Sequence, residues 1–336
     1  MGVDLGDLLN RKKVEIKDLS GKWLAIDAFN SLYQFLSIIR QPDGTPLMDS
    51  SGRVTSHLSG ILYRITTLIE AGSKVVFIFD GEPPHFKTGT IIERREARKK
   101  AEALWEEARA EGLDGFKYAQ AASKLSEEII NDSKLLLGKM GVPVVQAPSE
   151  GEAQASYMSI RGDVDFVASQ DYDSLLFGAT RVVRNLTITG KRKLPGKKVF
   201  VDVQPEIITL ESELFRLGIT RKQLVEIGIM CGTDYNTGLA RVGARTALRL
   251  IKTHGDLETV IESRNEAIDS FDEIREFFLH PDVTDEYTVR MDKPQIDEIV
   301  SFLCDERDFS RERVEKAARR LEEAYRVGQC TLDRWF

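Results

Sequence analysis

Seven acidic residues stand where short apolar segments of the sequence end or where a new helical pattern begins. They are Asp27, Asp80, Glu150, Glu152, Asp171, Asp173 and Asp234. Hard divalent cations such as Mg²⁺ take oxygen ligands, and two of them about 4 Å apart can activate a water and stabilise the leaving oxygen of a phosphodiester. Seven carboxylates exceed what one ion needs. The set therefore indicates a two-ion phosphodiester hydrolase.

Each acid, considered by itself, could instead have a purely structural role. Ser149 and Glu152 fit a capping box, in which Ser149 is the N-cap of a helix and Glu152 is its third residue. Asp173 could cap the helix that follows it, and Asp27 and Asp80 could form turns. These explanations do not account for so many acids at one predicted sheet edge. Crowded carboxylates repel one another, and a bound metal relieves the repulsion.

The acids are positioned by alternating strands and helices. The predicted buried strands cover residues 22–29, 74–81, 142–148 and 164–173, and the predicted helices between them cover 56–72 and 133–141. This alternation predicts an α/β fold with a central, mainly parallel sheet flanked by helices. In such sheets the functional crevice lies at the carboxyl ends of the strands, where Asp27, Asp80 and Asp171 stand.

Outside the predicted α/β sheet, the character of the sequence changes at two points. Residues 93–128 are dominated by charges, which fits either a solvated helix with ion pairs or a polar helical segment that crosses or gates a channel. After Asp202 the chain becomes mostly helical, and residues 220–236 and 241–255 predict two helices joined by a short hairpin that contains glycine. Helices continue to about Val327, and a short tail with two terminal aromatic residues follows.

Charge and composition narrow the class of protein. The net charge is −7, and the seven acids account for all of it, so the rest of the chain sums to zero and is compatible with a DNA-binding surface. Residues 181–198 carry seven cations and no acid: Arg181, Arg184, Lys191, Arg192, Lys193, Lys197 and Lys198.

The three cysteines and four histidines show no zinc-ligand spacing. With neither a signal peptide nor a membrane span in the pattern, we expect a cytoplasmic, nucleoid-associated protein.

Two cations follow the second predicted strand. Lys87 and Arg94 come seven and fourteen residues after Asp80. A cation beside the scissile phosphate would stabilise the pentacoordinate transition state, although an ordinary exposed cation is the simpler explanation for either residue alone.

The motifs in the chain are similar to those of archaeal-type flap endonucleases, which belong to the superfamily of structure-specific 5′ nucleases that includes XPG. The similarity covers nearly the whole chain and is carried by IDAFNSLYQFL, DGTPLMDSSGRVTSHLSGILYR, FIFDGEPP, QAPSEGEAQASYM, SQDYDSLLFGA, RNLTITGKRKLPGK, GTDYN and QCTLDRWF. The resemblance implies endonucleolytic cutting of double-stranded DNA that bears a 5′ flap, near the junction, together with a weaker 5′–3′ exonuclease. It also implies roles in DNA replication, through Okazaki fragment maturation, and in repair.

The resemblance assigns roles to individual residues. The first Mg²⁺ site matches Asp27, Asp80, Glu150 and Glu152, and the second matches Asp171, Asp173 and Asp234, with Mn²⁺ able to substitute. Lys87 and Arg94 match the basic residues at the foot of a helical arch, and Tyr33 matches a residue that stacks on a base near the cut. The expected DNA-contacting positions are Tyr33, Arg40, Arg64, Glu150, Gly232, Asp234, Lys191, Arg192 and Lys193.

The same resemblance divides the chain into regions. These are an N-terminal nuclease region at 1–98, an arch at 99–130, an internal nuclease region with a helix-hairpin-helix at 116–258, C-terminal helices at 259–327 and a tail at 328–336. The tail resembles a binding box for the sliding clamp PCNA. Its residues Gln329, Leu332, Trp335 and Phe336 place an apolar plug on one face of a helical turn. A frayed tail is the alternative, but free tails seldom expose two large aromatic rings. We expect a monomer that does not bind membranes.

One position departs from the family pattern. The hairpin of the helix-hairpin-helix usually carries Gly-x-Gly, and here Arg241 stands in place of the first glycine, before Val242 and Gly243. Backbone N–H groups at this turn would hold a phosphate of the duplex, and the family binds a potassium ion nearby. The arginine side chain either crowds that approach or supplies a phosphate contact of its own.

Two other classes of protein compete with a nuclease. A phosphatase with an aspartyl nucleophile needs a second Asp two residues after the first-strand Asp, but that position is Phe29. A non-catalytic scaffold that binds flaps and the clamp would explain the tail and the basic stretch, but it would not need seven acids.

Overall fold

The computed structural model describes residues 2–84, 96, 100, 125–187, 190–193 and 200–332, of which 190–193, 200–202 and 328–332 are described by their backbone alone. Most of the charge-rich segment at 93–128, including Arg94, lies outside these ranges, as do Lys87, Trp335 and Phe336.

A seven-stranded sheet lies at the centre of the described residues, with strand order β1-β9-β6-β5-β2-β3-β4. Its strands are β1 (Lys12–Lys13), β2 (Trp23–Asp27), β3 (Lys74–Phe79), β4 (Val144–Gln146), β5 (Phe166–Ala168), β6 (Arg181–Arg184) and β9 (Glu206–Thr209). The five strands from β4 to β6 are parallel, whereas β9 runs antiparallel to β6 and to β1. The predicted α/β class with a mainly parallel sheet is confirmed.

Both faces of the sheet are buried, which explains why β2 and β3 read as unbroken apolar runs. Side chains alternate along a strand, so Ala25 and Val76 enter one core cluster while Leu24 and Val75 enter the other.

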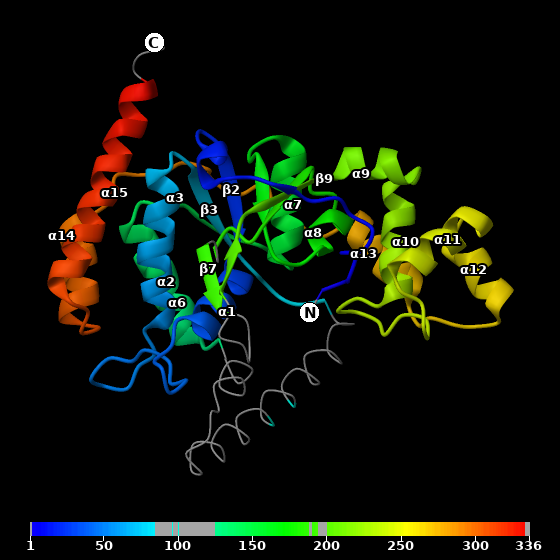
Figure 1. Ribbon diagram of the computed structural model, residues 1–336, viewed down its shortest axis with the longest axis horizontal. Coiled ribbons are helices and arrows are strands. Elements are labelled where there is room, and N and C mark those ends of the chain that lie inside the picture. The colour runs from blue at the N-terminus through cyan, green and yellow to red at the C-terminus, as the bar shows by residue number, and fades with distance from the viewer. Residues whose placement is uncertain are drawn as a thin grey trace.

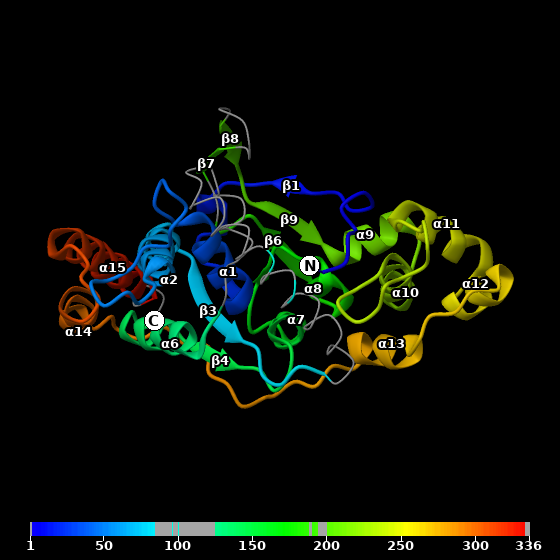
Figure 2. The same ribbon diagram turned by 90° about the horizontal axis from the view of Figure 1, so that it is seen from below.

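Helices cover each face. The core cluster on the first face draws side chains from α7 (Gly151–Arg161), α8 (Asp173–Leu176) and α9 (Leu210–Leu217), which contact the strands, and from α10 (Arg221–Cys231), α11 (Ala244–His254), α12 (Leu257–Arg264) and α13 (Phe271–Leu279), where α10 packs on α8 and contacts the other three. The cluster on the second face draws side chains from η1 (Ile16–Leu19), α1 (Ala28–Ile38), α2 (Ser56–Gly60), the π-helical turn η2 (Ile61–Ile65), α3 (Thr66–Glu70) and α6 (Glu127–Lys139), and from α14 (Ile296–Val300), the π-helical turn η4 (Ser301–Asp305) and α15 (Arg311–Leu332), which pack on these helices or on one another. Figures 1 and 2 show α10–α13 at one end of the molecule and α14 and α15 at the other, with the sheet between them.

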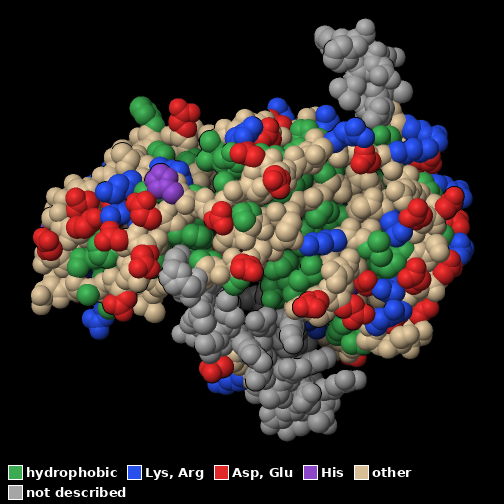
Figure 3. Space-filling view, turned by 180° about the vertical axis from the view of Figure 1, so that it is seen from behind, with side chains coloured by type: hydrophobic (Ala, Val, Ile, Leu, Met, Phe, Trp, Pro, Cys, Tyr) green, Lys and Arg blue, Asp and Glu red, His purple; other side chains and the backbone are tan. Residues whose placement is uncertain are grey.

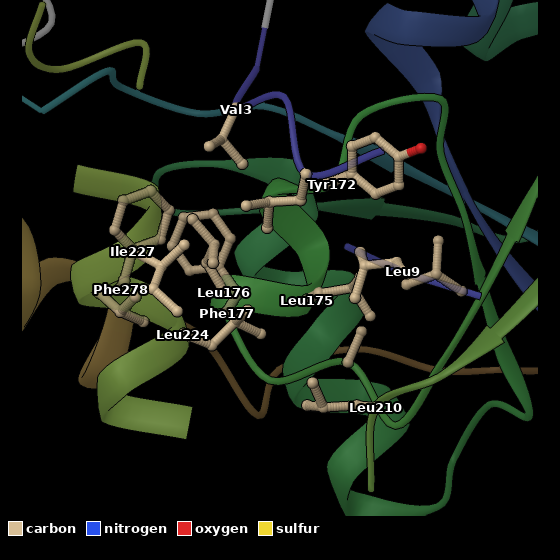
Figure 4. Close-up of a cluster of buried hydrophobic side chains, with 14 of the residues drawn as sticks. Val3, Leu9, Tyr172, Leu175, Leu176, Phe177, Leu210, Leu224, Ile227 and Phe278 are labelled. Atoms are coloured by element: carbon tan, nitrogen blue, oxygen red, sulfur yellow. The ribbon is translucent and has the colours of Figure 1, made fainter. Parts of the chain in front are cut away.

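The first core cluster joins the chain terminus to the helices that follow the sheet. In Figure 4, Val3 and Tyr172 lie to one side of Leu176, the last residue of α8, and of Phe177, which follows it, and Phe278 of α13 borders the same cluster. Burial of this amount of aliphatic and aromatic surface fixes α8 against the sheet. It therefore fixes the acids at the start of α8 as well.

Several predicted boundaries were wrong by a few residues. The strand predicted at 164–173 ends at Ala168, because a tight turn intervenes before α8 begins at Asp173. The helix predicted at 56–72 is continuous from Ser56 to Glu70, but it contains the π-helical turn η2. The predicted end of the helices near Val327 was also too early, since α15 extends to Leu332.

Short strands went unpredicted. The sequence patterns did not predict β1, β6, β9 or the separate hairpin of β7 (Gly190–Lys193) and β8 (Phe200–Val203). The basic stretch from 181 to 198 therefore begins in a sheet strand and continues through β7. Among the described residues, no helix has the length and apolar character needed to cross a membrane. Figure 3 shows Lys, Arg, Asp and Glu side chains interspersed over the rear face, so the net negative charge does not form one acidic face there.

Candidate active site

The parallel strands bring three of the acids to one edge of the sheet. Asp27 is the last residue of β2, Asp80 follows the last residue of β3, and Asp171 follows β5 after a short turn. Strand β2 lies between β3 and β5, and Asp27 pairs in register with Ile78. The three carboxyl groups thus leave the sheet side by side at its carboxyl edge.

Asp27 has a structural role in addition to its place at this edge. It is the N-cap of α1, and its Oδ1 accepts a hydrogen bond from the backbone N–H of Asn30 at 3.0 Å. Its side chain is almost wholly buried, with 7% of the residue exposed. A cap requires only one of the two carboxylate oxygens, so this bond leaves the other available to a ligand.

Asp80 connects β3 to the start of α7. Its Oδ1 accepts the backbone N–H of Gly151 at 2.8 Å. A Cβ at position 151 would stand 2.6 Å from the same oxygen, so only glycine permits this approach. The acid is thereby held against the N-terminus of α7, where the partial positive charge of the helix favours an anion.

The capping box proposed for Ser149 and Glu152 is absent, because α7 begins at Gly151 with Glu150 in the N-cap position and no side-chain capping bond. Glu152 instead accepts hydrogen bonds from the hydroxyls of Ser169 and Ser174 at its Oε1. The helix therefore points two acids towards the sheet edge instead of using one to close its own first turn.

Asp173 does not cap α8 either, since it is the first residue of that helix and Tyr172 is the N-cap. Its Oδ1 accepts the backbone N–H of Val3 at 2.8 Å. The first residues of the chain therefore reach into the acid cluster.

Asp234 approaches from the opposite side, on the turn that follows α10. Thr233 donates its backbone N–H to the carbonyl of Asn236, and Gly232 ends α10 with a φ of +91°. A Cβ on Gly232 would lie only 3.0 Å from the carbonyl oxygen of Thr237. The adjacent Tyr235 packs edge-on against Phe277 and Phe278 of α13. The turn is thus anchored on both sides.

The acids are close enough to disturb one another. Burial raises the pKa of Asp27 well above its usual range, and the neighbouring charges of Asp80, Asp171 and Glu150 raise it further. Burial likewise raises the pKa of Glu152, followed by the charges of Asp173, Asp27 and Asp171. These mutual effects join acids from four separate segments, as the sequence prediction of a common cluster expects.

Asp234, the remaining acid, belongs to the cluster because its charge acts on Asp173. Burial raises the pKa of Asp173 to about 7, and Asp234 and Asp171 contribute in the same direction. The pKa of Tyr235 is also raised, by burial first and then by Glu150, Asp173, Asp234 and Glu152. Asp234 is therefore part of the same electrostatic unit as the acids of the sheet edge.

This unit suits divalent cations in its chemistry. Its donors are carboxylate oxygens, their surroundings are buried, and their charges repel in a way that positive ions would relieve. Within the described ranges, no three His, Cys, Asp or Glu side chains form a group that could hold a metal ion as they stand.

Other predicted site residues occupy different elements. Tyr33 lies on α1, Arg64 is exposed on η2, and Gly232 is at the end of α10. Arg40 follows α1, and its guanidinium donates to the carbonyls of Leu36 and Gly44. The backbone of Lys191, Arg192 and Lys193 forms β7, and that of Gln329 and Leu332 forms the end of α15, but their side chains are outside the described set.

Sequence reasoning missed the polar residues that hold the acids. Ser169 and Ser174 bind Glu152, and Asn30 donates its side-chain N–H to Asp171 at 3.0 Å. The one available signal was proximity in sequence, because each lies within five residues of a predicted acid.

Arg241 adopts the conformation that a glycine would have adopted. Its φ is +61°, in the left-handed region, and its side chain is exposed at the hairpin before α11. The turn is therefore kept despite the substitution, and the side chain does not fold back into the protein.

Comparisons with known proteins agree with this arrangement. Models of the XPG N-terminal domain and the XPG I-region match residues 1–101 and 141–234. Flap endonuclease 1 of Methanothrix thermoacetophila is 64% identical, and that of Archaeoglobus fulgidus is 57% identical; each alignment covers 100% of both chains. The solved structure of flap endonuclease-1 from Methanococcus jannaschii is 41% identical, with a TM-score of 0.78 over 96% of this chain and 98% of that one.

Proposed function

This chain belongs to the flap endonuclease 1 family of XPG nucleases, and from that premise we propose that it cuts DNA bearing a 5′ flap at the junction of single and double strand. We extend the proposal to a weaker 5′–3′ exonuclease activity and to roles in Okazaki fragment maturation and repair. The observation that carries it is the buried set of acids that the sheet edge, α7, α8 and the turn after α10 bring together.

The acids would hold two Mg²⁺ ions, or Mn²⁺ in their place. Asp27, Asp80, Glu150 and Glu152 would form the first site, and Asp171, Asp173 and Asp234 the second. When bound, the ions supply an activated water and neutralise charge on the leaving oxygen of the phosphodiester. The support for this assignment is the donor chemistry and the mutual rise of carboxyl pKa values.

The chain's own groups orient these ligands and the DNA. The hydroxyls of Ser169 and Ser174 fix one oxygen of Glu152, and the Gly151 N–H fixes one oxygen of Asp80. Lys87 and Arg94 would stabilise charge on the transferring phosphate. Tyr33 would stack on a base near the cut, and backbone contacts to DNA would come from the cationic positions Arg40, Arg64, Lys191, Arg192 and Lys193 and from Gly232.

Mapping of cleavage products on matched flap, nick, gap and bubble DNAs in Mg²⁺ tests the proposal. We expect cutting at the base of the 5′ flap, complete inhibition by EDTA, and little cutting of the bubble. Asp171→Ala should lose at least about 100-fold in rate, the scale on which loss of a group that stabilises transition-state charge is felt. Asp269→Ala, which removes an exposed acid between α12 and α13, is the matched control. Wild-type turnover by Asp171→Ala would refute the metal assignment.

We further propose that the C-terminal segment binds a sliding clamp. The backbone of α15 carries Gln329 and Leu332 on one helix, so its last turn can present an anchor and an apolar residue on one face. Trp335 and Phe336 would extend that face. Deletion of residues 329–336 should abolish clamp binding in surface plasmon resonance and leave cutting of free flaps unchanged. If both were lost together, the tail would not be separable from the nuclease. Light scattering should report a monomer.

A further inference from the structure

Asn30 touches two acids that come from different strands. Its backbone N–H donates to Oδ1 of Asp27 at 3.0 Å, and its side-chain Nδ2 donates to Oδ2 of Asp171 at 3.0 Å. Asp27 ends β2, and Asp171 follows β5. One residue in the first turn of α1 therefore spans the gap between a member of each proposed metal site.

The amide of Asn30 is held in turn by two further side chains. Gln34 donates its Nε2 to Oδ1 of Asn30, and Thr187 donates its hydroxyl to Oε1 of Gln34 at 2.6 Å. Asn30 and Gln34 are four residues apart in α1, so they lie on the same face of the helix. Thr187 is 5% exposed and belongs to the segment that leaves β6.

The hydrogen bonds in this series of side chains all run in the same direction from donor to acceptor. The donors run from the Thr187 hydroxyl through the amides of Gln34 and Asn30 to the carboxylate of Asp171. A reversed Asn30 amide would place its oxygen against the carboxylate and its N–H₂ against that of Gln34. The charged end therefore fixes the orientation of both amides, and bonds aligned in this sense strengthen one another.

Hydrogen bonds position these side chains beside a small pocket. Asn30, Gln34, Ser169 and Thr187 line this pocket, which leaves room for about one water molecule. The hydroxyl oxygen of Ser169 also accepts a hydrogen bond from the backbone N–H of Asp171 at 3.2 Å. Residues on two sides of the pocket therefore hold Asp171.

We propose that Asn30, Gln34 and Thr187 are positioning residues, which orient Asp171 relative to Asp27 and so set how tightly the second site takes a divalent cation. The inference rests on the proposed function, because it takes Asp171 as a metal ligand. It also gives the segment between β6 and β7 a direct mechanical connection to the active site. That segment leads into the strand formed by Lys191, Arg192 and Lys193.

A matched pair of variants at Thr187, the member of this series furthest from Asp171, gives the cleanest test. Thr187→Val removes the hydroxyl with almost no change in shape, whereas Thr187→Ser keeps it. Thr67→Val is the control, because the Thr67 hydroxyl donates to the Tyr63 carbonyl within the α2–α3 helix and takes no part in the chain. Asn30→Leu removes the contact to Asp171 and leaves the backbone bond to Asp27 in place.

Binding of Mn²⁺ to the full-length protein is measured without DNA, by electron paramagnetic resonance, and melting temperature is measured in EDTA. We expect Asn30→Leu to weaken Mn²⁺ binding by about tenfold or more, the usual effect of losing a group that orients a metal ligand. Thr187→Val should weaken it by a smaller factor in the same direction. Thr187→Ser and Thr67→Val should bind as wild type, and melting in EDTA should be unchanged for Thr187→Val.

Wild-type Mn²⁺ affinity in both Asn30→Leu and Thr187→Val would overturn the proposal. Equal losses in Thr187→Val and Thr187→Ser would overturn it too, because the hydroxyl would then be irrelevant. Failure of the proposed function looks different: the wild type would then leave flap DNA uncut in Mg²⁺. The Mn²⁺ measurement needs no cleavage, so the two failures are read separately.

Discussion

Asp173 ionises at a cost to the folded protein. Burial and neighbouring charges raise the pKa of Asp173 from 3.8 to about 7. A carboxyl group with a raised pKa binds more protons in the folded state than in the unfolded state between these two values. Stability therefore falls as pH rises from about 4 to about 7, and it does not recover above that range unless a cation arrives.

Asp173→Asn should remove this cost while keeping the acceptor oxygen for the Val3 N–H. We expect the metal-free variant to be more stable than wild type by about 2 kcal/mol at pH 8, with little difference at pH 4. Thermal melting in EDTA across this pH range measures it. Added Mg²⁺ should close the gap, and flap cutting should be lost. A constant difference at all pH values would show that charge repulsion is not the cause.

Thr66 lowers the stability of the folded protein for a different reason, which is a buried hydroxyl group. It is fully buried in α3, and its hydroxyl has no hydrogen-bond partner among the described residues. Valine has the same shape without the polar atom. Thr66→Val should therefore raise the free energy of unfolding by about 1 kcal/mol and leave the flap-cutting rate unchanged, since an unsatisfied buried hydroxyl is removed. Denaturant melts and initial rates test both halves. A destabilised variant would mean that the hydroxyl is satisfied after all.

At the level of elements, the hairpin between α10 and α11 keeps a glycine-like turn with an arginine in it. Arg241 has a φ of +61°, and such a conformation costs an L-residue about 1 kcal/mol or more. Its exposed side chain would be available to a phosphate of duplex DNA bound at this hairpin. On this proposal the turn gives up some stability and gains a cation.

Arg241→Gly should relieve the backbone strain and remove the cation together. We expect a gain in stability of only a few tenths to about 1 kcal/mol, because the relief of strain is partly offset by the greater entropy that a glycine loses on folding. Duplex binding should weaken, and the slope of log affinity against log salt should fall by about one phosphate contact. Arg241→Lys keeps the charge and the strain, so its binding should be near wild type without a gain in stability. Unchanged salt dependence in Arg241→Gly would exclude a phosphate contact.

Sequence patterns predicted the long elements and missed the short ones. The runs around Ile26 and Phe77 are apolar on both faces, which only a covered parallel strand requires, so β2 and β3 were found. Strand β1 has two residues, too few for any periodicity. The prediction of a capping box at Ser149 and Glu152 failed because the pattern is local, whereas Glu152 accepts hydrogen bonds from Ser169, which follows β5, and from Ser174 of α8. The acid cluster was predicted because strand ends must meet; the amides that hold it left no pattern.

On the scale of the whole molecule, the C-terminal helices are held to the second face of the sheet by ion pairs that bridge distant segments. Arg307, which follows η4, donates Nε and Nη2 to the two oxygens of Asp132 on α6, at 3.0 and 2.8 Å. Both residues are largely buried, at 8% and 9% exposure. The Arg307 guanidinium also lies over the Phe302 ring, and Arg320 of α15 pairs with Glu70 of α3. The long helix that leads to the C-terminus is therefore joined to the sheet through α3 and α6.

Breaking the Asp132–Arg307 pair should loosen this attachment more than any surface pair would. Asp132→Ala leaves the buried guanidinium with only the exposed Glu306, 3.7 Å away, to balance its charge, and we expect a loss of about 3 kcal/mol in stability. The double variant Asp132→Leu/Arg307→Met removes both charges and should cost less than Asp132→Ala alone. Glu322→Ala, which breaks the exposed pair with Arg326 within α15, is the control and should cost under about 0.5 kcal/mol. Equal losses in Asp132→Ala and in the control would contradict a buried, structural pair. Because the pair joins α6 to the segment after η4 and is not at the carboxyl edge of the sheet where the acids lie, the rate of flap cutting below the melting transition should be the same in all four proteins.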